Sequence, residues 1–280
     1  MRTVLITGAT SGFGKLLAEV FLKQGDRVIA TGRNLLERRD IFDKDRSTYQ
    51  NRLLEFTMDV TKKSEIEDVI QVLKEKNLSV DILINNAGHG LFGALEDLEE
   101  EDIRHQMEVN FFGTVNVTKM FLPFLRQSKG KIFNFSSVFG FMGFPLTSLY
   151  CASKYAVEGL TESLRGELSP FGVQVCLIEP GGYRTNFGNS LKWVQKTSSY
   201  ELQLSNYRDL HRKISLRKPQ EPLEVAIGIL NLSKKQTLPM RKVFGKDGNF
   251  SYILKRFLPS SLYFGIMDLV FRKVFLKAKN

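Results

Sequence analysis

The sequence is poor in the residues that build metal centres and disulfide frameworks. Its 280 residues include 2 cysteines, 3 histidines and 1 tryptophan, and no Cys or His cluster has the spacing of metal ligands. Because no such cluster is present, we expect neither Cys151 nor Cys176 to act as a nucleophile or a metal ligand. No internal repeat or low-complexity stretch is visible. These absences argue against a zinc site, a disulfide-rich secreted fold and a repeat array.

The sequence also lacks the long apolar runs of membrane-spanning helices. The first predicted strand begins at Arg2 or Thr3, where a signal segment would otherwise lie. In the C-terminal tail the longest uncharged run, Phe257 to Met267, has 11 residues, well short of the roughly 20 that cross a bilayer. With 42% hydrophobic and 25% charged residues, the composition is that of a globular domain. We expect a cytoplasmic protein with reduced cysteines.

What the sequence does contain is an alternation of strand-like and helix-like segments. This alternation predicts an α/β fold: a single Rossmann-type domain with a doubly wound parallel sheet and helices on both faces. In such sheets, ligands bind at the carboxyl ends of the strands. The strand-like runs lie at residues 2–7, 27–31, 53–57, 81–84, 131–135 and 173–178.

A glycine-rich turn follows the first strand directly. Glycines let the backbone approach a pyrophosphate, and the free amides at the start of the following helix favour the anion. The spacing, Gly-x3-Gly-x-Gly, departs from the Gly-x-Gly-x-x-Gly of many dinucleotide-binding folds. Strand, turn and helix together predict a dinucleotide phosphate site. The turn consists of Gly8, Ala9, Thr10, Ser11, Gly12, Phe13 and Gly14.

Tyr150 and Lys154 are four residues apart in a predicted helix over 150–168, which places both on one face. A phenol has an ordinary pKa of about 10, and a neighbouring ammonium favours its ionised form. The Ser137 hydroxyl can donate to a substrate carbonyl oxygen while Tyr150 gives that oxygen a proton. The alternative is a packed tyrosine and a solvated lysine that share a helix face by chance.

With these motifs, residues 2 to 250 resemble the short-chain dehydrogenase/reductase family, including its steroid or retinol dehydrogenases and its 3-oxoacyl reductases. The resemblance implies that Asn110, Ser137, Tyr150 and Lys154 form a catalytic tetrad. In it, Asn110 supports a water of the proton relay, and Lys154 also holds the nicotinamide ribose. The resemblance further implies a homodimer or homotetramer built partly on the helix that carries Tyr150.

The same resemblance places the cofactor contacts. Gly8, Gly12 and Gly14 lie at the phosphates, with Thr10, Ser11 and Phe13 in the same turn. Residues that follow later strands contact the adenine, the adenosine ribose and the nicotinamide amide. These are, in that order, Asp59 and Val60; Asn86, Ala87 and Gly88; and Pro180, Gly181 and Thr185.

The end of the second strand lacks the acidic residue that usually selects NAD. Gly32 occupies that position and Arg33 follows it. A guanidinium can form charge-assisted hydrogen bonds with the 2′-phosphate of NADP, so we predict NADP(H) in preference to NAD(H). The alternative is a solvated Arg33, with Glu37 one turn into the next helix bending back to a ribose.

Aromatic and apolar residues dominate the segments that bind substrate in the family. Such a pocket suits a ketone or secondary alcohol on a lipid-like, steroid-like, retinoid-like or acyl-like molecule. Alternatively, several of these side chains belong to the core or to a subunit interface. His89 stays outside the catalytic set, as a backbone-bonded loop residue. The apolar candidates are Leu91, Phe92, Phe139, Phe141, Met142, Phe144, Tyr183, Phe187 and Trp193.

Charge is distributed unevenly along the chain. Residues 1–190 hold 22 basic and 24 acidic residues, whereas residues 191–280 hold 18 and 6. The basic part suits anionic lipid headgroups, an anionic acyl carrier or an ordinary solvated surface. We predict a catalytic domain over 1–250 and a basic, amphipathic extension over 251–280, with a helix near 260–275. That helix either lies on a membrane, caps the pocket, or packs on its own domain or a partner subunit.

The sequence therefore predicts an NADP(H)-dependent oxidoreductase that transfers a hydride between nicotinamide and a ketone or secondary alcohol on a hydrophobic molecule. A nucleic-acid partner is not expected, because the basic charge lies outside any recognisable reading motif. The alternative is a non-catalytic protein that keeps the fold for cofactor sensing or for interaction at a membrane.

Overall fold

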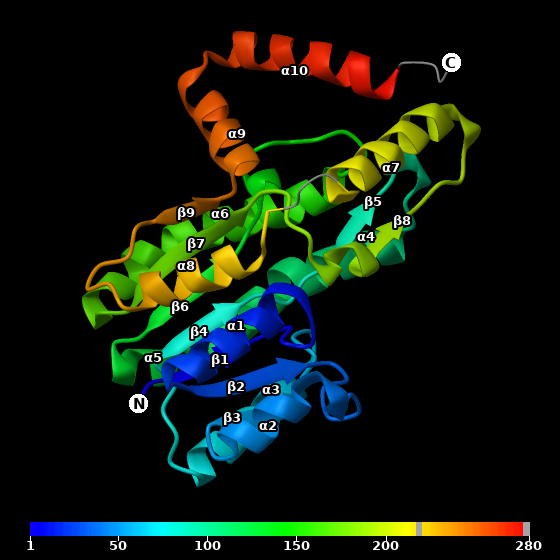
Figure 1. Ribbon diagram of the computed structural model, residues 1–280. Coiled ribbons are helices and arrows are strands. Elements are labelled where there is room, and N and C mark those ends of the chain that lie inside the picture. The colour runs from blue at the N-terminus through cyan, green and yellow to red at the C-terminus, as the bar shows by residue number, and fades with distance from the viewer. Residues whose placement is uncertain (217–219, 277–280) are drawn as a thin grey trace.

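A computed structural model describes residues 1–216 and 220–276 (Figure 1). Seven parallel strands form the central sheet in the order β3-β2-β1-β4-β6-β7-β9. All six expected strand regions are present, with β9 as a seventh strand, so the predicted doubly wound sheet is confirmed. The strands are β1 (Thr3–Ile6), β2 (Arg27–Gly32), β3 (Leu53–Thr57), β4 (Ile82–Asn85), β6 (Lys131–Phe135), β7 (Gln174–Pro180) and β9 (Arg241–Phe244).

The direction of winding reverses at β1. This strand pairs with β2 on one side and with β4 on the other, so that Val4 lies opposite both Val28 and Ile82. From β1 the chain continues outward through β2 and β3, then returns to β4 and proceeds the other way. At such a switch point the connections leave the strand ends in opposite directions, which opens a crevice at the carboxyl ends of β1 and β4.

Helices cover both faces of the sheet because successive strand residues point to opposite sides. Val4 and Ile6 face one hydrophobic cluster, whereas Leu5 faces the other. The first face carries α1 (Gly12–Gln24), α2 (Asp43–Tyr49) and α8 (Leu223–Ser233). The second face carries α3 (Lys63–Glu75), α5 (Gly113–Ser128) and α6 (Ser148–Leu168).

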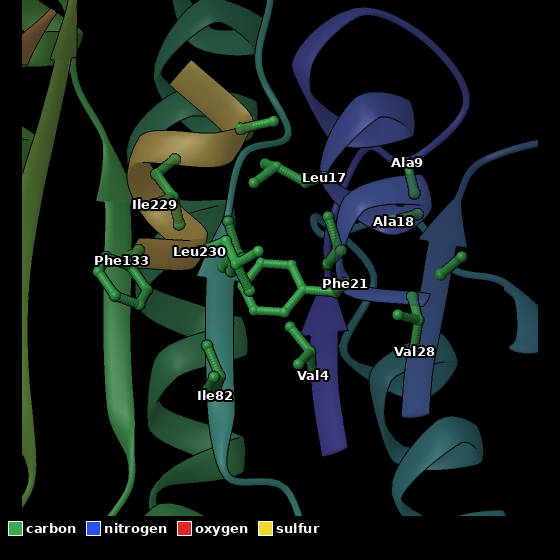
Figure 2. Close-up of a cluster of buried hydrophobic side chains, with 14 of the residues drawn as sticks. Val4, Ala9, Leu17, Ala18, Phe21, Val28, Ile82, Phe133, Ile229 and Leu230 are labelled. Carbon is green, nitrogen blue, oxygen red and sulfur yellow. The ribbon is translucent and has the colours of Figure 1, made fainter. Parts of the chain in front are cut away.

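Phe21 is at the centre of the first layer. Its side chain is completely buried, and Figure 2 shows it reaching from α1 toward Leu230 of α8 and Val4 of β1. A buried phenylalanine typically contributes several kcal/mol of stability, of the order of 3–5 when it is cut back to alanine. This packing fixes the start of α1, and therefore the glycine turn, against the end of β1.

Two features of the fold have no counterpart in the sequence-based prediction. The strands β5 (Gly90–Phe92) and β8 (Leu191–Trp193) form a small parallel sheet beside the main one; at three residues each, they are too short to show a period. The helix α9 (Lys246–Phe257) was also missed, and the expected start of the extension at residue 251 lies inside it. By contrast, α10 (Ser260–Phe275) matches the predicted helix.

The remaining elements connect these layers. Figure 1 shows α9 and α10 as the outermost elements at one end of the molecule, away from the β3 edge of the sheet. The helix α10 packs against α7. The other helices are α4 (Glu100–Met107) and α7 (Glu201–Leu216), and the short helical turns are η1 (Arg39–Phe42), η2 (Leu95–Asp97), η3 (Glu108–Phe112), η4 (Val138–Gly140), η5 (Ser169–Phe171), η6 (Asn186–Ser190) and η7 (Ser198–Tyr200).

Candidate active site

A cleft lies at the carboxyl ends of β1, β2, β3 and β4, where the reversal of winding places it. Most of the predicted cofactor residues line it. Met58, Val109 and Ser190 line it too, and sequence reasoning missed them, although Met58 and Val109 directly precede Asp59 and Asn110. The predicted residues in the cleft wall are Gly8, Thr10, Ser11, Gly12, Phe13, Arg33, Asp59, Val60, Asn86, Ala87, Gly88 and Thr185.

The glycine turn has a backbone that other residues rarely adopt. Gly8 and Gly12 have positive φ angles of 66° and 54°, and a Cβ atom on Gly14 would lie 2.2 Å from the Gly8 carbonyl oxygen. Gly14 therefore serves the packing of the turn and does not line the cleft. Ser11 precedes α1, but within the described structure its side chain makes no capping hydrogen bond, and the first turn has no acidic residue. The start of α1 thus suits an anion.

Asn86 ties the end of β4 to the glycine turn. Its side-chain amide donates to the carbonyl oxygens of Thr7 at 2.9 Å and Gly8 at 3.1 Å. In return, the Thr7 hydroxyl accepts from the backbone amides of Asn86 at 2.9 Å and Ala87 at 3.0 Å. The two strand ends on either side of the switch point are therefore held together by side chains as well as by the sheet.

Arg33 follows β2 and is exposed at the cleft wall. Within residues 1–216 and 220–276 it has no hydrogen bond or ion pair, so its guanidinium is available to a ligand. The segment 33–37 forms turns, not the first turn of a helix. The alternative placed Glu37 one turn into a helix, and this segment forms no helix. Glu37 also does not line the cleft.

The four residues of the predicted tetrad come from three segments and are all buried. Tyr150 and Lys154 lie on α6, Ser137 begins η4 after β6, and Asn110 lies in the π-helical turn η3. The Lys154 Nζ is 5.8 Å from the centre of the Tyr150 ring. The same ammonium donates to the carbonyl oxygen of Phe135, the last residue of β6, at 2.9 Å. The lysine and the tyrosine thus share a helix face, as the spacing predicted.

The π-helical turn aims Asn110 at the loop after β4. Its Nδ2 donates to the His89 carbonyl oxygen at 3.0 Å and to the Ser153 hydroxyl at 3.1 Å, while its Oδ1 accepts from the His89 amide at 3.0 Å. A Cβ atom on Gly88 would lie 3.1 Å from Asn110 Oδ1 and 3.7 Å from Lys154 Nζ. Gly88 therefore leaves room for the contact between this loop and both polar side chains. Such π turns are frequent at functional sites.

Burial determines the protonation of the site. It raises the pKa of Tyr150, while a contact with the Ser137 hydroxyl opposes the rise. Burial also lowers the pKa of Lys154 to about 8, and the nearby Glu158 carboxylate opposes that change. The spacing led us to expect a lowered pKa for Tyr150, but burial raises it in the folded protein, because desolvation disfavours the phenolate. Near neutral pH Tyr150 carries its proton.

Two buried carboxylates share one guanidinium. Glu158 of α6 and Glu179 of β7 both face Arg241 of β9, whose Nη1 lies 3.2 Å from the first and 2.7 Å from the second. Burial raises the pKa of each carboxyl group, because one guanidinium offsets the charge of two buried acids only in part. Sequence reasoning missed this group, since its members lie on three separate elements that only the folded chain brings together.

Pro180 and Gly181 stand apart from the cleft wall. Pro180 ends β7, and the loop after it is held by Asp247 of α9, whose Oδ2 accepts from the Gly182 amide at 2.6 Å. A Cβ atom on Gly181 would lie 2.5 Å from the same carboxylate. Of the three residues expected at the nicotinamide amide, only Thr185 lines the cleft.

Aromatic side chains surround Tyr150. The rings of Phe92, Phe139 and Phe187 lie 5.9, 6.0 and 5.9 Å from it, centre to centre. Phe144 extends the group toward the C-terminal helices. We call this set the aromatic cluster; its further members are Leu146, Leu191, Trp193, Tyr207, Leu210, Phe271, Val274 and Phe275.

Not every aromatic residue expected at the substrate joins this cluster. Phe141 packs on Tyr252 of α9 at 5.5 Å, and Tyr183 packs on Phe13 at 5.7 Å. The interpretation of some of these side chains as packing residues is therefore correct. Phe13 itself also lines the cleft.

A second hollow borders the aromatic cluster. It is a groove of about 850 Å³ between α10, the start of α7 and the segments after β5 and η4. Leu146, Phe271 and Phe275 belong to both the groove wall and the aromatic cluster. These three side chains therefore connect the groove to the cluster that contains Tyr150.

The histidine and cysteines considered in the sequence lie outside the proton-transfer set. His89 lines the cleft, but burial and the neighbouring His105, 4.9 Å away ring to ring, lower its pKa to about 4, so that it is neutral near pH 7. Cys151 and Cys176 are buried free thiols. Burial raises the pKa of both, which disfavours the reactive thiolate.

Comparisons with known proteins show which family and fold the chain shares. Residues 2–195 match the short chain dehydrogenase family. A 3-ketodihydrosphingosine reductase of Bacteroides thetaiotaomicron is 36% identical over 251 residues, which are 87% of this chain and 88% of the relative. The crystal structure of a short-chain dehydrogenase from Streptomyces avermitilis has a TM-score of 0.81 at 32% identity, over 98% of this chain and 96% of that one. The closed form of a serine dehydrogenase complexed with NADP+ has a TM-score of 0.74 at 26% identity, over 87% and 94%.

Proposed function

The chain belongs to the short-chain dehydrogenase family, and on that premise we propose that it is an NADP(H)-dependent oxidoreductase acting on a ketone or secondary alcohol of a hydrophobic molecule. The observation that carries the proposal is the convergence of Ser137, Tyr150 and Lys154 beside a glycine-lined cleft and under an aromatic cluster. The first two supply hydrogen bonds and a proton, the cleft suits a dinucleotide, and the cluster suits an apolar substrate.

The cleft fits a nicotinamide dinucleotide on structural grounds. Gly8 and Gly12 have the positive φ angles that glycine adopts where a backbone approaches a ligand closely, and the start of α1 suits a pyrophosphate. When bound there, the cofactor supplies or accepts the hydride. The exposed Arg33 at the cleft wall supports NADP(H), because its guanidinium can pair with a 2′-phosphate. The NADP+ bound to the serine dehydrogenase supports the same choice.

The protein's own groups then handle the proton. The Ser137 hydroxyl donates to the carbonyl oxygen of the substrate, and Tyr150 gives that oxygen its proton as the hydride arrives on carbon. The phenolate left on Tyr150 is stabilised by the Lys154 ammonium, which the Phe135 carbonyl holds in place at 2.9 Å. Oxidation of an alcohol runs through the same groups in reverse. A neutral, buried tyrosine suits the reductive direction.

The aromatic cluster supports a hydrophobic substrate. Phe92, Phe139 and Phe187 leave few polar partners around the phenol, and the adjoining groove of about 850 Å³ is large enough for a chain of several carbons. The related 3-ketodihydrosphingosine reductase bears a name that denotes a keto group on a sphingoid molecule. The serine dehydrogenase keeps the same fold for a different substrate, so the pocket and not the fold supports this choice.

The first experiment measures NADPH and NADH oxidation by the purified full-length protein with a 3-keto sphingoid base, a ketosteroid, retinal, a 3-oxoacyl thioester and a small polar ketone. We expect turnover of at least one apolar ketone, with NADPH preferred. Turnover of small polar ketones alone would contradict the substrate assignment. No turnover with any of them would favour a non-catalytic role for the fold.

A pair of variants then tests the mechanism. Tyr150→Phe removes the transferable proton, so we expect kcat to fall by about 10²–10⁴-fold while NADPH binding, followed by fluorescence titration, is retained. Tyr155→Phe is the matched control, because Tyr155 lies on the same helix but is exposed. Near wild-type turnover by Tyr150→Phe would overturn the proposal.

A further inference from the structure

The helices α9 and α10 expose an apolar surface that the fold of the domain leaves uncovered. On α9, Phe250, Ile253 and Phe257 are each more than half exposed. They are spaced three and four residues apart and therefore share one face of the helix. Phenylalanine and isoleucine side chains in such a contiguous row are unusual on a surface that contacts water alone, and mark an interaction site.

The helix α10 has two different sides. Tyr263, Met267 and Phe275 are buried, and Phe275 belongs to the aromatic cluster next to Tyr150. Leu262, Leu269 and Leu276, by contrast, are spaced seven residues apart and are each more than half exposed, so they line one side of the helix. One side of α10 therefore closes the apolar layer of the candidate active site while the other carries a second row of exposed apolar residues.

A cation–π contact joins the two helices. The Lys255 Nζ of α9 lies 4.5 Å from the centre of the Tyr263 ring and 4.7 Å from that of Phe264, both in α10. Such contacts are favourable at exposed sites, and α9 and α10 also touch directly. The two apolar rows therefore belong to one structural unit, which Figure 1 shows at the outer end of the molecule. We call it the C-terminal hairpin (residues 246–276).

The charge on this hairpin is positive. Arg256, Arg272 and Lys273 are exposed beside the apolar rows, and Asp268 is the one acidic residue of the sequence after position 247. Lys277 and Lys279 lie outside the described residues. Two copies of this surface packed together would oppose their positive charges, which disfavours a homodimer through the hairpin. A partner with apolar material beneath negative charge complements it.

We propose that the C-terminal hairpin docks the protein on the surface of a membrane that contains anionic phospholipid. Exposed phenylalanine and leucine side chains enter the boundary between headgroups and acyl chains, and the flanking arginines and lysines pair with lipid phosphates. The contact is peripheral, because within the described residues no helix is long and apolar enough to cross a bilayer. This inference does not require the proposed reductase activity, since it concerns binding alone.

Docking in this orientation has a consequence for substrate entry, which does rest on the proposed function. Phe271, Phe275 and Leu276 of the hairpin line the groove of about 850 Å³, and Phe275 also reaches the aromatic cluster. A hydrophobic ketone dissolved in the bilayer would therefore meet the groove at the docked face and avoid a passage through water.

The test is flotation of the full-length protein with vesicles of phosphatidylcholine alone or of phosphatidylcholine mixed with phosphatidylglycerol. We expect binding to the anionic vesicles, weaker binding to the neutral ones, and a loss of binding at high salt as the charges are screened. The double variant Ile253→Ser/Phe257→Ser should lower the apparent affinity at least tenfold. Arg256→Gln should lower it about fivefold, the usual contribution of one basic side chain at an anionic surface.

Controls keep the result specific. Phe171→Ser removes an aromatic residue that is 50% exposed in η5, a part of the surface outside the hairpin, and should bind vesicles like the wild type. Unchanged binding by the Ile253→Ser/Phe257→Ser variant, or no vesicle binding by the wild type, would overturn the proposal. The proposal would also be overturned if light scattering showed a dimer for the wild type and a monomer for the Ile253→Ser/Phe257→Ser variant while the two bound vesicles equally. NADPH oxidation with a soluble ketone, measured in parallel, reports separately on the proposed function.

Discussion

The ring of Phe275, in the last turn of α10, lies 5.6 Å from the ring of Phe144, in the segment that follows Ser137. This contact joins the C-terminal helix to the neighbourhood of the candidate proton donor. Phe144 in turn belongs to the same aromatic cluster as Tyr150. The extension is therefore part of the wall of the candidate substrate site, and its sequence bears on which substrates fit.

Removing the Phe275 ring should affect long substrates more than short ones. Phe275 is buried and belongs both to the groove wall and to the aromatic cluster. For Phe275→Ala we expect kcat/KM for a long-chain ketone to fall about tenfold or more, as for other losses of apolar contact with a substrate. We expect kcat/KM for a short soluble ketone to change little. Phe171→Ala, at a half-exposed residue outside the hairpin and the groove, serves as the control. An equal loss with both ketones would count against the assignment.

Arg33 should decide between the two nicotinamide cofactors. Loss of charge-assisted hydrogen bonds to a 2′-phosphate costs about 1.5–3 kcal/mol, so Arg33→Ser should lower the ratio of kcat/KM for NADPH to that for NADH by about 10–100-fold. Arg38→Ser is the control, because Arg38 lies in the same turn region but does not line the cleft. If Glu37→Gln changed the ratio and Arg33→Ser did not, the NAD(H) alternative would be correct.

The pH dependence of reduction should report the charge of Lys154. Burial lowers the pKa of Lys154 to about 8, so its ammonium is present below that pH and is lost above it. Because the ammonium stabilises the phenolate formed on Tyr150, kcat/KM for ketone reduction should fall about tenfold per pH unit above this value. The measurement is a steady-state profile from pH 6 to about 10. A flat profile over that range would show that the charge of Lys154 does not matter.

Unfolding gives an independent check of the same group. The ordinary pKa of a lysine is 10.5, whereas that of Lys154 in the folded protein is about 8. Between these values the unfolded chain binds a proton that the folded one does not, so this group makes the free energy of unfolding rise with pH. The free energy of unfolding of the wild type minus that of Lys154→Met, both measured in urea, should therefore increase from pH 8 to about 10.

The packing of α1 on the sheet should dominate stability. Phe21 is completely buried between α1, α8 and the strands, so Phe21→Ala should lower the free energy of unfolding by about 3–5 kcal/mol. Phe171→Ala removes a half-exposed ring whose notable contact is with the Arg126 guanidinium, 5.5 Å from its centre, and should cost less than about 1 kcal/mol. Equal losses for the two variants in urea unfolding would contradict the assignment of the core.

Several features could be predicted from the sequence because their causes are local. The strands over 53–57 and 131–135 have the predicted bounds, since β-branched and aromatic runs flanked by turns specify them directly. The helix over Ser260–Phe275 follows from its amphipathic period. The glycine turn and the shared face of Tyr150 and Lys154 follow from spacing alone.

Other features depend on contacts between distant segments, and no local pattern carries them. The pKa of Tyr150 is one: the sequence places Lys154 beside it, but burial among Phe92, Phe139 and Phe187 reverses the expected direction. The pair of short strands at Gly90–Phe92 and Leu191–Trp193 is another, since the two segments stabilise each other only after the chain has folded.

The sequence by itself determined that this protein is a doubly wound α/β domain with a dinucleotide turn and a tyrosine–lysine pair, because hydrophobic period, glycine positions and helical spacing act over a few residues. Only the tertiary structure decided which side of the basic C-terminal tail packs on the domain and which side is exposed. Its helix α10 buries Phe275 against residues more than 100 positions earlier, such as Phe144, and exposes Leu262 and Leu269. Which side of an amphipathic helix is covered depends on what the rest of the chain brings to it, and that is a property of the folded molecule.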